Sequence, residues 1–407
     1  MSHRRRLLNL VMGNKATGVC TLYHIDLHSP KNNLFYPTAA AAAAKDPSSS
    51  STSLKKMKRI RPGEPRLSFQ SMPPANSHLP GRWFDCAALS ESKTVFLDYH
   101  SRGGSIYDDD ARCVVTLPTL HASKWFPICL AAAGAAAGDK DPGGDDNIFV
   151  VGSGHSMYPA GDDANSRFQF QAMVHRKDWH PALSYVNKWR CDDLPPPPYV
   201  GDEGYRKTMI GSYGIVGAGL VFVSTEGIGT YCFDMPTRTW TKAGDWALPF
   251  SGKVEHLPEL GVLVGFPTWE EDQRVCASPL PWTVSATVDG RRPELCKDSA
   301  SLQPPYAWKR VMKQEPRLVS LGSGKLCAVQ FFESKKDSCR SCGREDVDKR
   351  FAVFTGLEVV RAGEDDGGGN GKGGGSRSIR VVRHKSKRYM LPHDDDDLHN
   401  IFIKSVL

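Results

Sequence analysis

Cys339 and Cys342 form a C-x-x-C pair, and two thiols at this spacing can bind zinc or exchange disulfides. A structural zinc site needs two further Cys or His ligands at matching spacing, and the sequence has no second pair of that kind. The surrounding residues (KKDSCRSCGREDVDKR) are polar and charged, which is typical of an exposed loop. We therefore favour a loop over a metal or redox site, and whether the pair binds metal stays open.

A second stretch with catalytic residue types begins at Gly152. Gly152 and Gly154 could belong to a phosphate-binding loop, but no Walker lysine follows them and no helix is expected there. His155, Ser156 and Asp162 have the side chains of a hydrolase triad, but no nucleophile-elbow sequence surrounds them. We therefore assign no catalytic, cofactor-binding or metal-binding residue, and we expect no cofactor.

Three short charged runs have simple interpretations. The basic runs Lys55–Arg59 (KKMKR) and His384–Arg388 (HKSKR) are short matches to nuclear-localisation signals or phosphate contacts. The first would be accessible if it continues a disordered insertion, and whether it is a nuclear signal stays open. The second is interpreted as the flank of an edge strand, where charge discourages aggregation. The acidic run Asp394–Asp397 is interpreted as solvated rather than metal-binding.

Tryptophans gather in the middle of the chain, where they could stack on a nucleic acid or a sugar. Packing between sheets explains them more simply. The formal net charge of +7 comes from 52 basic and 45 acidic residues spread along the chain, so we expect no nucleic-acid partner. The tryptophans concerned are Trp240, Trp246, Trp269, Trp282 and Trp308.

The cysteines and the hydropathy of the chain predict where in the cell the protein is located. The eleven cysteines are odd in number and sit singly in apolar stretches, which predicts reduced core thiols rather than disulfides. The start of the chain lacks a signal-peptide cleavage site, and no window approaches the ~18 apolar residues of a membrane helix. We expect a cytoplasmic or nuclear protein with no membrane segment. The cysteines used here are Cys20, Cys113, Cys129, Cys232 and Cys327.

Short β-branched and aromatic runs bounded by Gly, Pro, Ser or Asp dominate the sequence and predict an all-β chain. Only Ala131–Ala137 could be helical, and its glycine argues against even that. Six hairpin-like turns join pairs of apolar runs, at uneven separations that fit kelch-type blades of ~50 residues with inserted loops. They lie around Asn14, Glu91, Asp146, Ala218, Glu259 and Ser323.

Two pairs of similar segments support an internal repeat in the sequence. Val216–Val221 matches Leu321–Leu326, each with a tight glycine turn between strands. In a second pair of segments an aromatic strand ends at Asp108 or Asp234, and the next strand follows and leads to Leu-Pro. This pattern predicts an outer hairpin whose aspartate caps the turn.

Several stretches carry a resemblance to a known family. They are RRRLLNLVM at Arg4–Met12, LPPPPYV at Leu194–Val200, STEGIGTYCFD at Ser224–Asp234, WALPFSGKVEHLPEL at Trp246–Leu260, and near the end LVSLGSGKLCAVQFF, FAVFTGLEVV and RHKS. The chain resembles an uncharacterised plant family, domain of unknown function number sixteen sixty-eight, which is similar to kelch-type β-propellers. The resemblance implies a kelch-like propeller and brings no catalytic residues. Paired glycines and the Tyr or Trp that follows them do not recur in every unit, which departs from a strict kelch repeat and leaves the blade count open. We predict six blades, with seven as the alternative.

The propeller is expected to span residues 1–407 as one domain with two disordered insertions. These are the low-complexity insertion at 38–61 and the Gly-rich loop at 363–378. A propeller closes by pairing its first and last strands, so LLNLVMG or VCTLYHIDL should pair with FAVFTG or SIRVVRH.

Two hypotheses about the function of this chain are consistent with these observations. We favour a non-enzymatic protein-interaction scaffold, a monomer that binds a protein partner not identified by sequence, because propellers present variable recognition loops. The alternative is an enzyme or small-ligand binder that uses the central channel. A channel ligand would be indicated by like polar residues at equivalent positions of every repeat, and the sequence shows no such ring.

Overall fold

The computed structural model describes most of the chain, and every statement below concerns the described residues. These are 5–45, 57–70, 84–99, 101–122, 124, 127–132, 146–152, 170–180, 184–202, 208–217, 219–268, 274–282, 293–296, 298–302, 308–311, 314–335, 347–361, 378–391 and 401–407. The secondary structure is almost entirely antiparallel β-sheet, which confirms the all-β prediction.

Three sheets have four strands each, and their strands follow one another in space almost as in sequence. The first contains β1 (Leu7–Asn14), β2 (Val19–Asp26), β3 (Pro65–Gln70) and β25 (Ile401–Val406), in the order β25-β1-β2-β3. The second contains β4 (Phe84–Ala88), β5 (Lys93–Asp98), β6 (Gly104–Asp108) and β7 (Cys113–Leu117). The third contains β8 (Pro127–Ala132), β9 (Asn147–Gly152), β10 (Phe170–His180) and β11 (Ser184–Leu194).

The remaining strands form a larger and a five-stranded sheet. The larger one has an antiparallel half of β12 (Ser212–Val216), β13 (Leu220–Thr225), β14 (Gly229–Asp234) and β15 (Thr239–Gly244). Its other half has β16 (Phe250–Leu257), β17 (Val262–Pro267), β18 (Arg274–Pro279) and β19 (Ala300–Ser301). A short parallel pairing of β12 with β16 joins the halves. The last sheet has β20 (Trp308–Arg310), β21 (Arg317–Gly322), β22 (Lys325–Lys335), β23 (Val347–Arg361) and β24 (Ile379–Met390).

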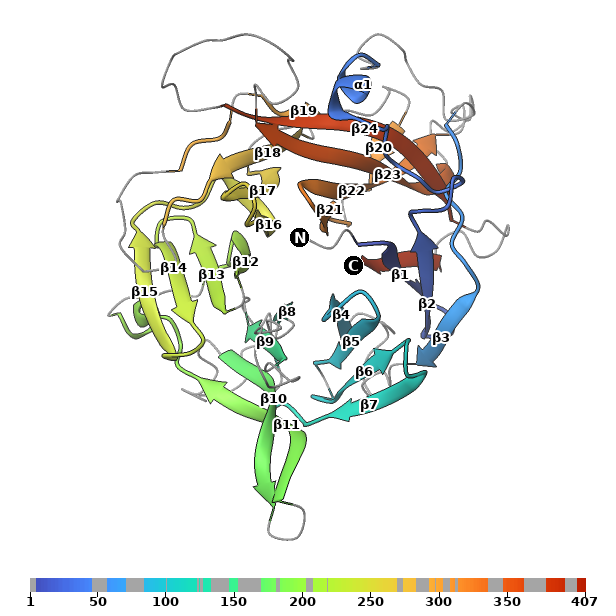
Figure 1. Ribbon diagram of the computed structural model, residues 1–407. Helices are drawn as coiled ribbons and strands as arrows, with labels where there is room; N and C mark the ends of the chain where they lie inside the picture. Colours follow the sequence, from blue (N-terminus) through green and yellow to red (C-terminus); the bar gives the residue numbers. More distant parts are fainter. Residues whose placement is uncertain are drawn as a thin grey trace, which may run out of the picture.

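These sheets stand side by side in a ring around a central space (Figure 1). One strand of each four-stranded unit lies nearest the centre, and these inner strands contact one another in cyclic order: β4, β8, β12, β16, β21, β25 and back to β4. The arrangement leaves every sheet with two neighbours, one on each face.

Alternation of side chains within the strands builds the core between neighbouring sheets. In β9, Phe149 and Val151 pack into one buried cluster with β13, whereas Ile148 and Val150 pack into another with β5. Successive residues of a strand point to opposite faces, so a strand that is apolar on both faces fills two interfaces at once. This explains why the sequence shows continuous apolar runs rather than clean alternation.

The predicted turns are confirmed where the structure describes them. Turns near Asn14, Glu91, Glu259 and Ser323 join β1 to β2, β4 to β5, β16 to β17 and β21 to β22. The pairs β8–β9 and β12–β13 are also antiparallel, as expected from the turns placed around Asp146 and Ala218.

The aspartate caps of the outer hairpins are confirmed as well. Asp108 Oδ1 accepts hydrogen bonds from the backbone N–H groups of Asp110 and Ala111, each at 3.1 Å. Asp234 Oδ2 accepts from the backbone N–H of Thr237 at 3.2 Å and from its hydroxyl at 2.6 Å. Each side chain thereby satisfies a turn donor that has no ladder partner.

The expectation that the insertion at 38–61 is disordered is wrong for its first residues. The helix α1 (Ala39–Ala43) lies inside the insertion expected to be disordered, is capped by Thr38 and packs against β24. Ala131 and Ala132, at the start of the stretch where a helix was considered and disfavoured, belong to strand β8. Alanine has high helix propensity, but contacts with the surrounding fold override that preference. The Gly-rich loop at 363–378 lies outside the described residues except for Ser378.

Closure of the ring uses a different partner from the one expected. β1 pairs with β25, and Met12 opposes Ile403 in this antiparallel ladder. The strands FAVFTG and SIRVVRH belong instead to β23 and β24 of the neighbouring five-stranded sheet. The final strand was missed because IFIKSV is short and begins only three residues after the acidic run.

Nine cysteines lie among the described residues, and all are free. Cys20, Cys232 and Cys327 are buried as predicted, whereas Cys113 is exposed on β7, so its assignment to the core is wrong. None of the helices in the described part of the chain has the length and hydropathy needed to cross a bilayer.

Candidate functional site

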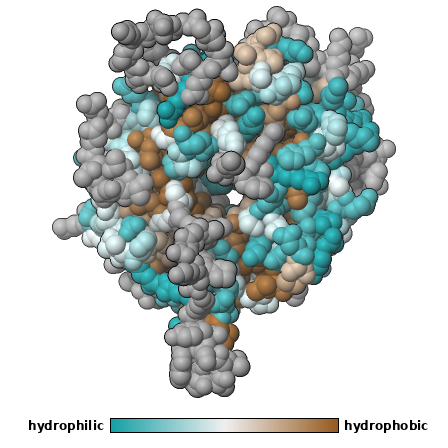
Figure 2. Space-filling model, in the orientation of Figure 1, coloured by the Kyte–Doolittle hydropathy of each residue, from teal (hydrophilic) through white to brown (hydrophobic). Residues whose placement is uncertain are grey.

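A cavity of about 420 Å³ opens at the centre of the ring. Figure 2 shows this face of the molecule hollowed near its centre. The inner strands β4, β8, β12, β16, β21 and β25 all contribute to its lining, so the cavity belongs to the whole ring rather than to one sheet. Its volume falls within the ~300–1,000 Å³ typical of small-molecule sites.

Charged side chains of both signs line the cavity, and basic ones are in excess. Five of them are basic and three are acidic: Arg5, Lys253, Arg274, Arg310 and Arg317, against Asp85, Glu255 and Glu315. An excess of basic groups in a recessed site favours anions, because the low-dielectric walls strengthen the field inside.

Two of the basic side chains, Lys253 and Arg5, already interact with other groups of the protein. Lys253 Nζ lies 2.8 Å from Glu255 Oε1 on the same strand. Arg5 donates from Nε to the carbonyl oxygen of Leu7 at 2.7 Å and from Nη2 to that of Leu407 at 3.0 Å. Burial lowers the pKa of Arg5, although the nearby Glu91 and Glu255 charges oppose the shift. Arg5 therefore serves mainly to hold its own segment against Leu407, the residue that follows strand β25.

Arg317 and Asp85 of the cavity form no ion pair with another described residue. Within the described part of the chain, neither Arg317 nor Asp85 has an oppositely charged group within 4.0 Å. Among the described residues, Asp85 Oδ1 accepts a hydrogen bond from the adjacent backbone N–H of Cys86, at 2.8 Å. These two groups are therefore available to the contents of the cavity.

The charges of Arg317 and Asp85 both affect the pKa of Tyr213. Burial raises the pKa of Tyr213 to about 12; Arg317 opposes the rise, and Asp85 and Glu315 add to it. The Tyr213 hydroxyl is thus protonated at neutral pH and can donate a hydrogen bond.

The cysteines of the cavity wall are poor nucleophiles. Burial raises the pKa values of Cys86 and Cys129 well above the ordinary value, and the Asp85 charge adds to both shifts. Because the thiolate is the reactive form, these residues act as small apolar wall residues at neutral pH.

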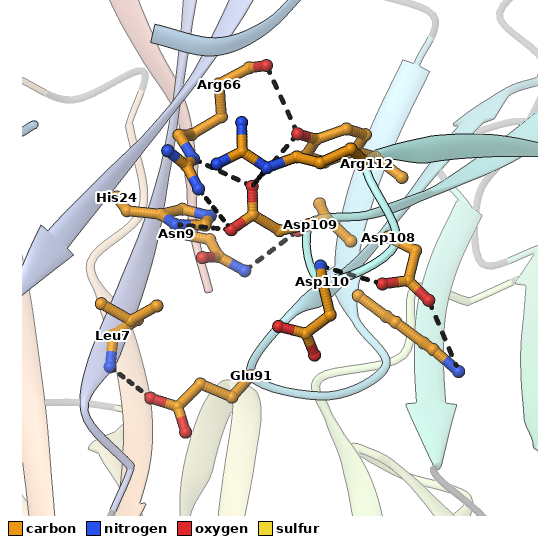
Figure 3. Close-up of polar contacts among 12 residues, drawn as sticks. Leu7, Asn9, His24, Arg66, Glu91, Asp108, Asp109, Asp110 and Arg112 are labelled. Atoms are coloured by element: carbon orange, nitrogen blue, oxygen red, sulfur yellow. Dashed lines mark hydrogen bonds and ion pairs between the residues drawn. The ribbon is translucent and has the colours of Figure 1, made fainter. Parts of the chain in front are cut away.

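A second polar cluster lies between the sheet of β1–β3 and the sheet of β4–β7 (Figure 3). Arg66 holds Asp109 through two parallel hydrogen bonds, Nε–Oδ1 at 2.9 Å and Nη2–Oδ2 at 2.6 Å. The Tyr107 hydroxyl donates to Asp109 Oδ1 at 3.1 Å, and His24 Nδ1 lies 3.7 Å from Oδ2. Burial lowers the pKa of His24, so this imidazole is neutral at pH 7. Because both oxygens of the Asp109 carboxylate accept hydrogen bonds, this cluster holds two sheets together rather than acting as an acid–base pair.

Most residues considered from sequence as chemical groups lie outside the described residues: Cys339, Cys342, Gly154, His155, Ser156, Asp162, Trp269 and Asp394–Asp397. Gly152 is the last residue of β9. The described tryptophans pack against other aromatic rings, as in the stacked pair Trp246–Trp282, with centroids 6.3 Å apart. Within the described part of the chain, no three His, Cys, Asp or Glu side chains cluster as a metal site would require.

The basic run His384–Arg388 was expected to flank an edge strand; it lies inside β24, which is itself the edge strand of its sheet. Its side chains hold an earlier segment against that edge: Lys385 Nζ donates to the carbonyl of Phe35 at 2.6 Å, and Lys387 Nζ to that of Lys31 at 2.5 Å. Burial lowers the pKa of Lys387 to about 8, and the charges of Lys385 and Lys58 add to the shift. These lysines therefore position backbone rather than bind phosphate.

From the other basic run, Lys58–Arg59 lies within the described residues, and it also contacts this edge. The backbone N–H of Arg388 donates to the carbonyl of Lys58 at 2.9 Å, and Arg59 forms an isolated bridge with Arg388. The side chains of Lys58 and Arg59 remain exposed. The nuclear-signal hypothesis stays a prediction.

Sequence reasoning missed the cavity residues, although a signal for them exists. Asp85, Lys253 and Arg317 occupy the same place in three different repeats, at one fixed spacing before the turns around Glu91, Glu259 and Ser323. Because the three residue types differ, a search for a ring of like polar residues overlooked them.

Solved structures with partial similarity have low sequence identity to this chain. A structural genomics protein of unknown function from Bacteroides thetaiotaomicron matches with 10% identity and a TM-score of 0.33, covering 63% of this chain and 53% of that one. The major Malassezia sympodialis allergen Mala s 1 matches with 10% identity and a TM-score of 0.36, covering 74% and 92%. Apo AztD from Citrobacter koseri matches with 11% identity and a TM-score of 0.33, covering 94% and 98%.

The chain thus spans about half the length of the Bacteroides protein. No curated protein matches the chain significantly. A family model does match, over residues 5–389, and its description is protein of unknown function (DUF1668). Since the match covers nearly the whole sequence, the chain belongs to the DUF1668 family of proteins of unknown function.

Proposed function

We propose that this chain is a six-bladed, kelch-like β-propeller and works as a non-enzymatic protein-interaction scaffold. The cyclic contacts of β4, β8, β12, β16, β21 and β25 support six blades, with one inner strand to each blade. The pairing of β25 with β1 supports closure of the first blade by both ends of the described chain.

The observation that carries the scaffold proposal is the exposed outer strand β7. Cys113, Val114, Val115 and Thr116 are exposed in succession, with Val114 54% and Val115 39% accessible. Apolar surface (brown) appears at the rim of the molecule at lower right, where β7 lies (Figure 2). Both faces of the strand are therefore exposed, and no strand of the described residues pairs with its outer edge.

The other outer strands carry features that block such pairing. β3 begins with Pro65, β11 and β15 contain charged residues such as Lys188 and Lys242, and β19 has only two residues. The edge of β24 is covered by α1 and the segment around Phe35. Proteins protect sheet edges in these ways to avoid unwanted strand pairing, so the unprotected β7 is the exception that needs a reason.

We assign to β7 the addition of an extended peptide from a protein partner. Backbone hydrogen bonds would provide affinity, and Val114 and Val115 would select uncharged β-branched side chains on the added strand. On the sequence arguments above, the proposal takes the chain as a monomer located in the cytoplasm or nucleus.

Selection from a displayed library of random peptides tests the proposal. The protein should enrich extended, uncharged, β-branched peptides, and their binding should slow amide exchange in residues 113–117. Val114→Lys should abolish the enrichment, because a charge on a strand edge opposes pairing. Thr241→Lys, at an exposed position of the corresponding strand β15, is the matched control. Peptides that bind Val114→Lys as tightly as the unmodified protein would refute this role of β7.

A further inference from the structure

We propose that the central cavity is a binding site for a small organic anion that carries a phosphate or carboxylate group on a body with hydroxyl or ammonium groups. This site is separate from β7 and goes beyond the peptide-binding function. Its construction from six inner strands makes it a fixed feature of the ring.

The cavity has room for such a molecule. At ~30 Å³ for each water, about 420 Å³ corresponds to roughly fourteen waters, which is the size of a sugar phosphate or a tricarboxylate. Apolar side chains such as Ile215, Val254 and Leu318 share the lining with the charged ones. A compact polar ligand with a carbon skeleton suits a wall of this mixed kind.

Arg317 provides the anion-binding group. It projects from the inner strand β21, is half-buried, and has no carboxylate within 4.0 Å among the described residues. Arg310 of β20 also lines the cavity without an ion pair there. The planar guanidinium group matches phosphate and carboxylate with two parallel hydrogen bonds, which favours these anions over a single point charge such as chloride.

Asp85 and Glu315 determine what the rest of the ligand must carry. Both carboxylates line the cavity, and neither forms an ion pair within the described part of the chain. They repel a bare anion but accept hydrogen bonds from hydroxyl or ammonium groups. The Tyr213 hydroxyl, beside the same charges, offers one further donor. The site therefore favours an anion with donor groups over inorganic phosphate alone.

Titration calorimetry on the full chain tests this site with three probes: inorganic phosphate, glucose 6-phosphate and citrate. We expect saturable binding of glucose 6-phosphate or citrate, tighter than that of inorganic phosphate. Arg317→Gln should weaken this binding by about tenfold or more, as expected for loss of a charged hydrogen-bonding partner. Lys309→Gln removes the same charge from an exposed position next to Arg310 and should leave binding unchanged.

Two further variants protect the test against misfolding. Arg317→Lys keeps the charge but loses the planar fork, and should bind more weakly than the unmodified protein while melting at the same temperature. Asp85→Asn should reduce the preference for glucose 6-phosphate over inorganic phosphate, because the sugar hydroxyls lose a charged acceptor while the repulsion of the anionic group is relieved for both probes. Absence of saturable binding for all three probes, or binding that is equal in Arg317→Gln and Lys309→Gln, overturns the proposal. If neither glucose 6-phosphate nor citrate binds more tightly than inorganic phosphate, the claim that the ligand has an organic body with donor groups is refuted.

Discussion

Single side chains hold neighbouring sheets together at points where backbone pairing is absent. Asp109 is the clearest case, since it lies in the turn after β6 but accepts two hydrogen bonds from Arg66 of β3. Glu91 acts similarly on the first sheet, because its Oε1 accepts from the backbone N–H groups of Arg6 and Leu7, each at 2.6 Å. Both contacts join sheets that share no strand ladder.

The stability contributed by Asp109 should depend on pH. The hydrogen bonds from Arg66 hold the pKa of Asp109 below its ordinary value of 3.8. A carboxyl group with a lowered folded pKa stabilises fully above its unfolded pKa, and this stabilisation is lost as the pH falls through the folded value. Asp109→Asn should therefore cost about 2 kcal/mol at pH 6 and progressively less below pH ~3.8.

Urea unfolding of the two proteins between pH 6 and pH 2.5 measures this difference. Asp110→Asn, at the exposed neighbouring position, is the control and should change little. A difference that stays constant over the whole pH range would show that the carboxylate charge is not the source of the stabilisation.

Gly217 needs the backbone freedom of glycine. Its φ of +62° is in the left-handed region, although apart from its two chain neighbours no described residue comes within 4 Å of the position that a Cβ would take. Gly217→Ala should therefore destabilise by about 1 kcal/mol through backbone strain alone. Gly219→Ala in the same turn has no positive φ and only ordinary contacts at 3.5 and 3.6 Å, so it should change stability by a few tenths. Equal losses from the two alanines in thermal unfolding would contradict this reading of the turn.

At the scale of elements, the β24 edge shows how a strand rich in basic residues is covered. The helix α1 buries Ala39 and Ala42 against Val382 of this strand. A five-residue helix is too short to be stable alone, so its structure depends on this contact. The helix α1 therefore forms because strand β24 offers an apolar surface on which it can pack.

Ala42→Gln should detach α1, because Ala42 is 1% exposed and a buried amide without partners costs about 1–3 kcal/mol. Ala43→Gln makes the same chemical change at an exposed position and should leave the helix docked. Amide exchange and limited proteolysis within residues 38–45 report the difference. Equal protection in the two variants would mean that the contact with β24 does not hold the helix.

At the scale of the whole molecule, the ring depends on a contact between the two ends of the described chain. Ile403 and Val406 of β25 are each 3% exposed and pack in one cluster with Leu8 and Leu10 of β1. Without β25, one edge of β1 and part of this cluster would face water, and the inner contacts with β4 and β21 would be lost.

Truncation after residue 400 should therefore lower the melting temperature of the whole protein, not only of one sheet. A synthetic peptide of residues 401–407 added in trans should restore much of the loss, whereas a scrambled peptide should not. The peptide can do this because its ladder with β1 and the buried Ile403 are contacts that the strand makes as a unit. A truncated chain that melts like the intact one would refute the closure of the ring by β25.

Much of the fold could be predicted because its signals are local. The turns at Glu91, Glu259 and Ser323 and the caps at Asp108 and Asp234 depend only on residues within a few positions, and they were found. The shared spacing before the turns marks Asp85 and Arg317 one at a time, but it does not show that they line one cavity with Tyr213, because the three meet only when the ring closes.

The sequence by itself determined the β class, the hairpin turns and the DUF1668 membership, because β-branched runs, turn residues and family motifs act over short stretches. Only the tertiary structure decided that β25 closes the ring, that Ala39–Ala43 is helical, and that unpaired charges converge on one cavity. Such contacts join residues hundreds of positions apart. Their free energy comes from burial and charge placement in three dimensions, which no local pattern of residues encodes.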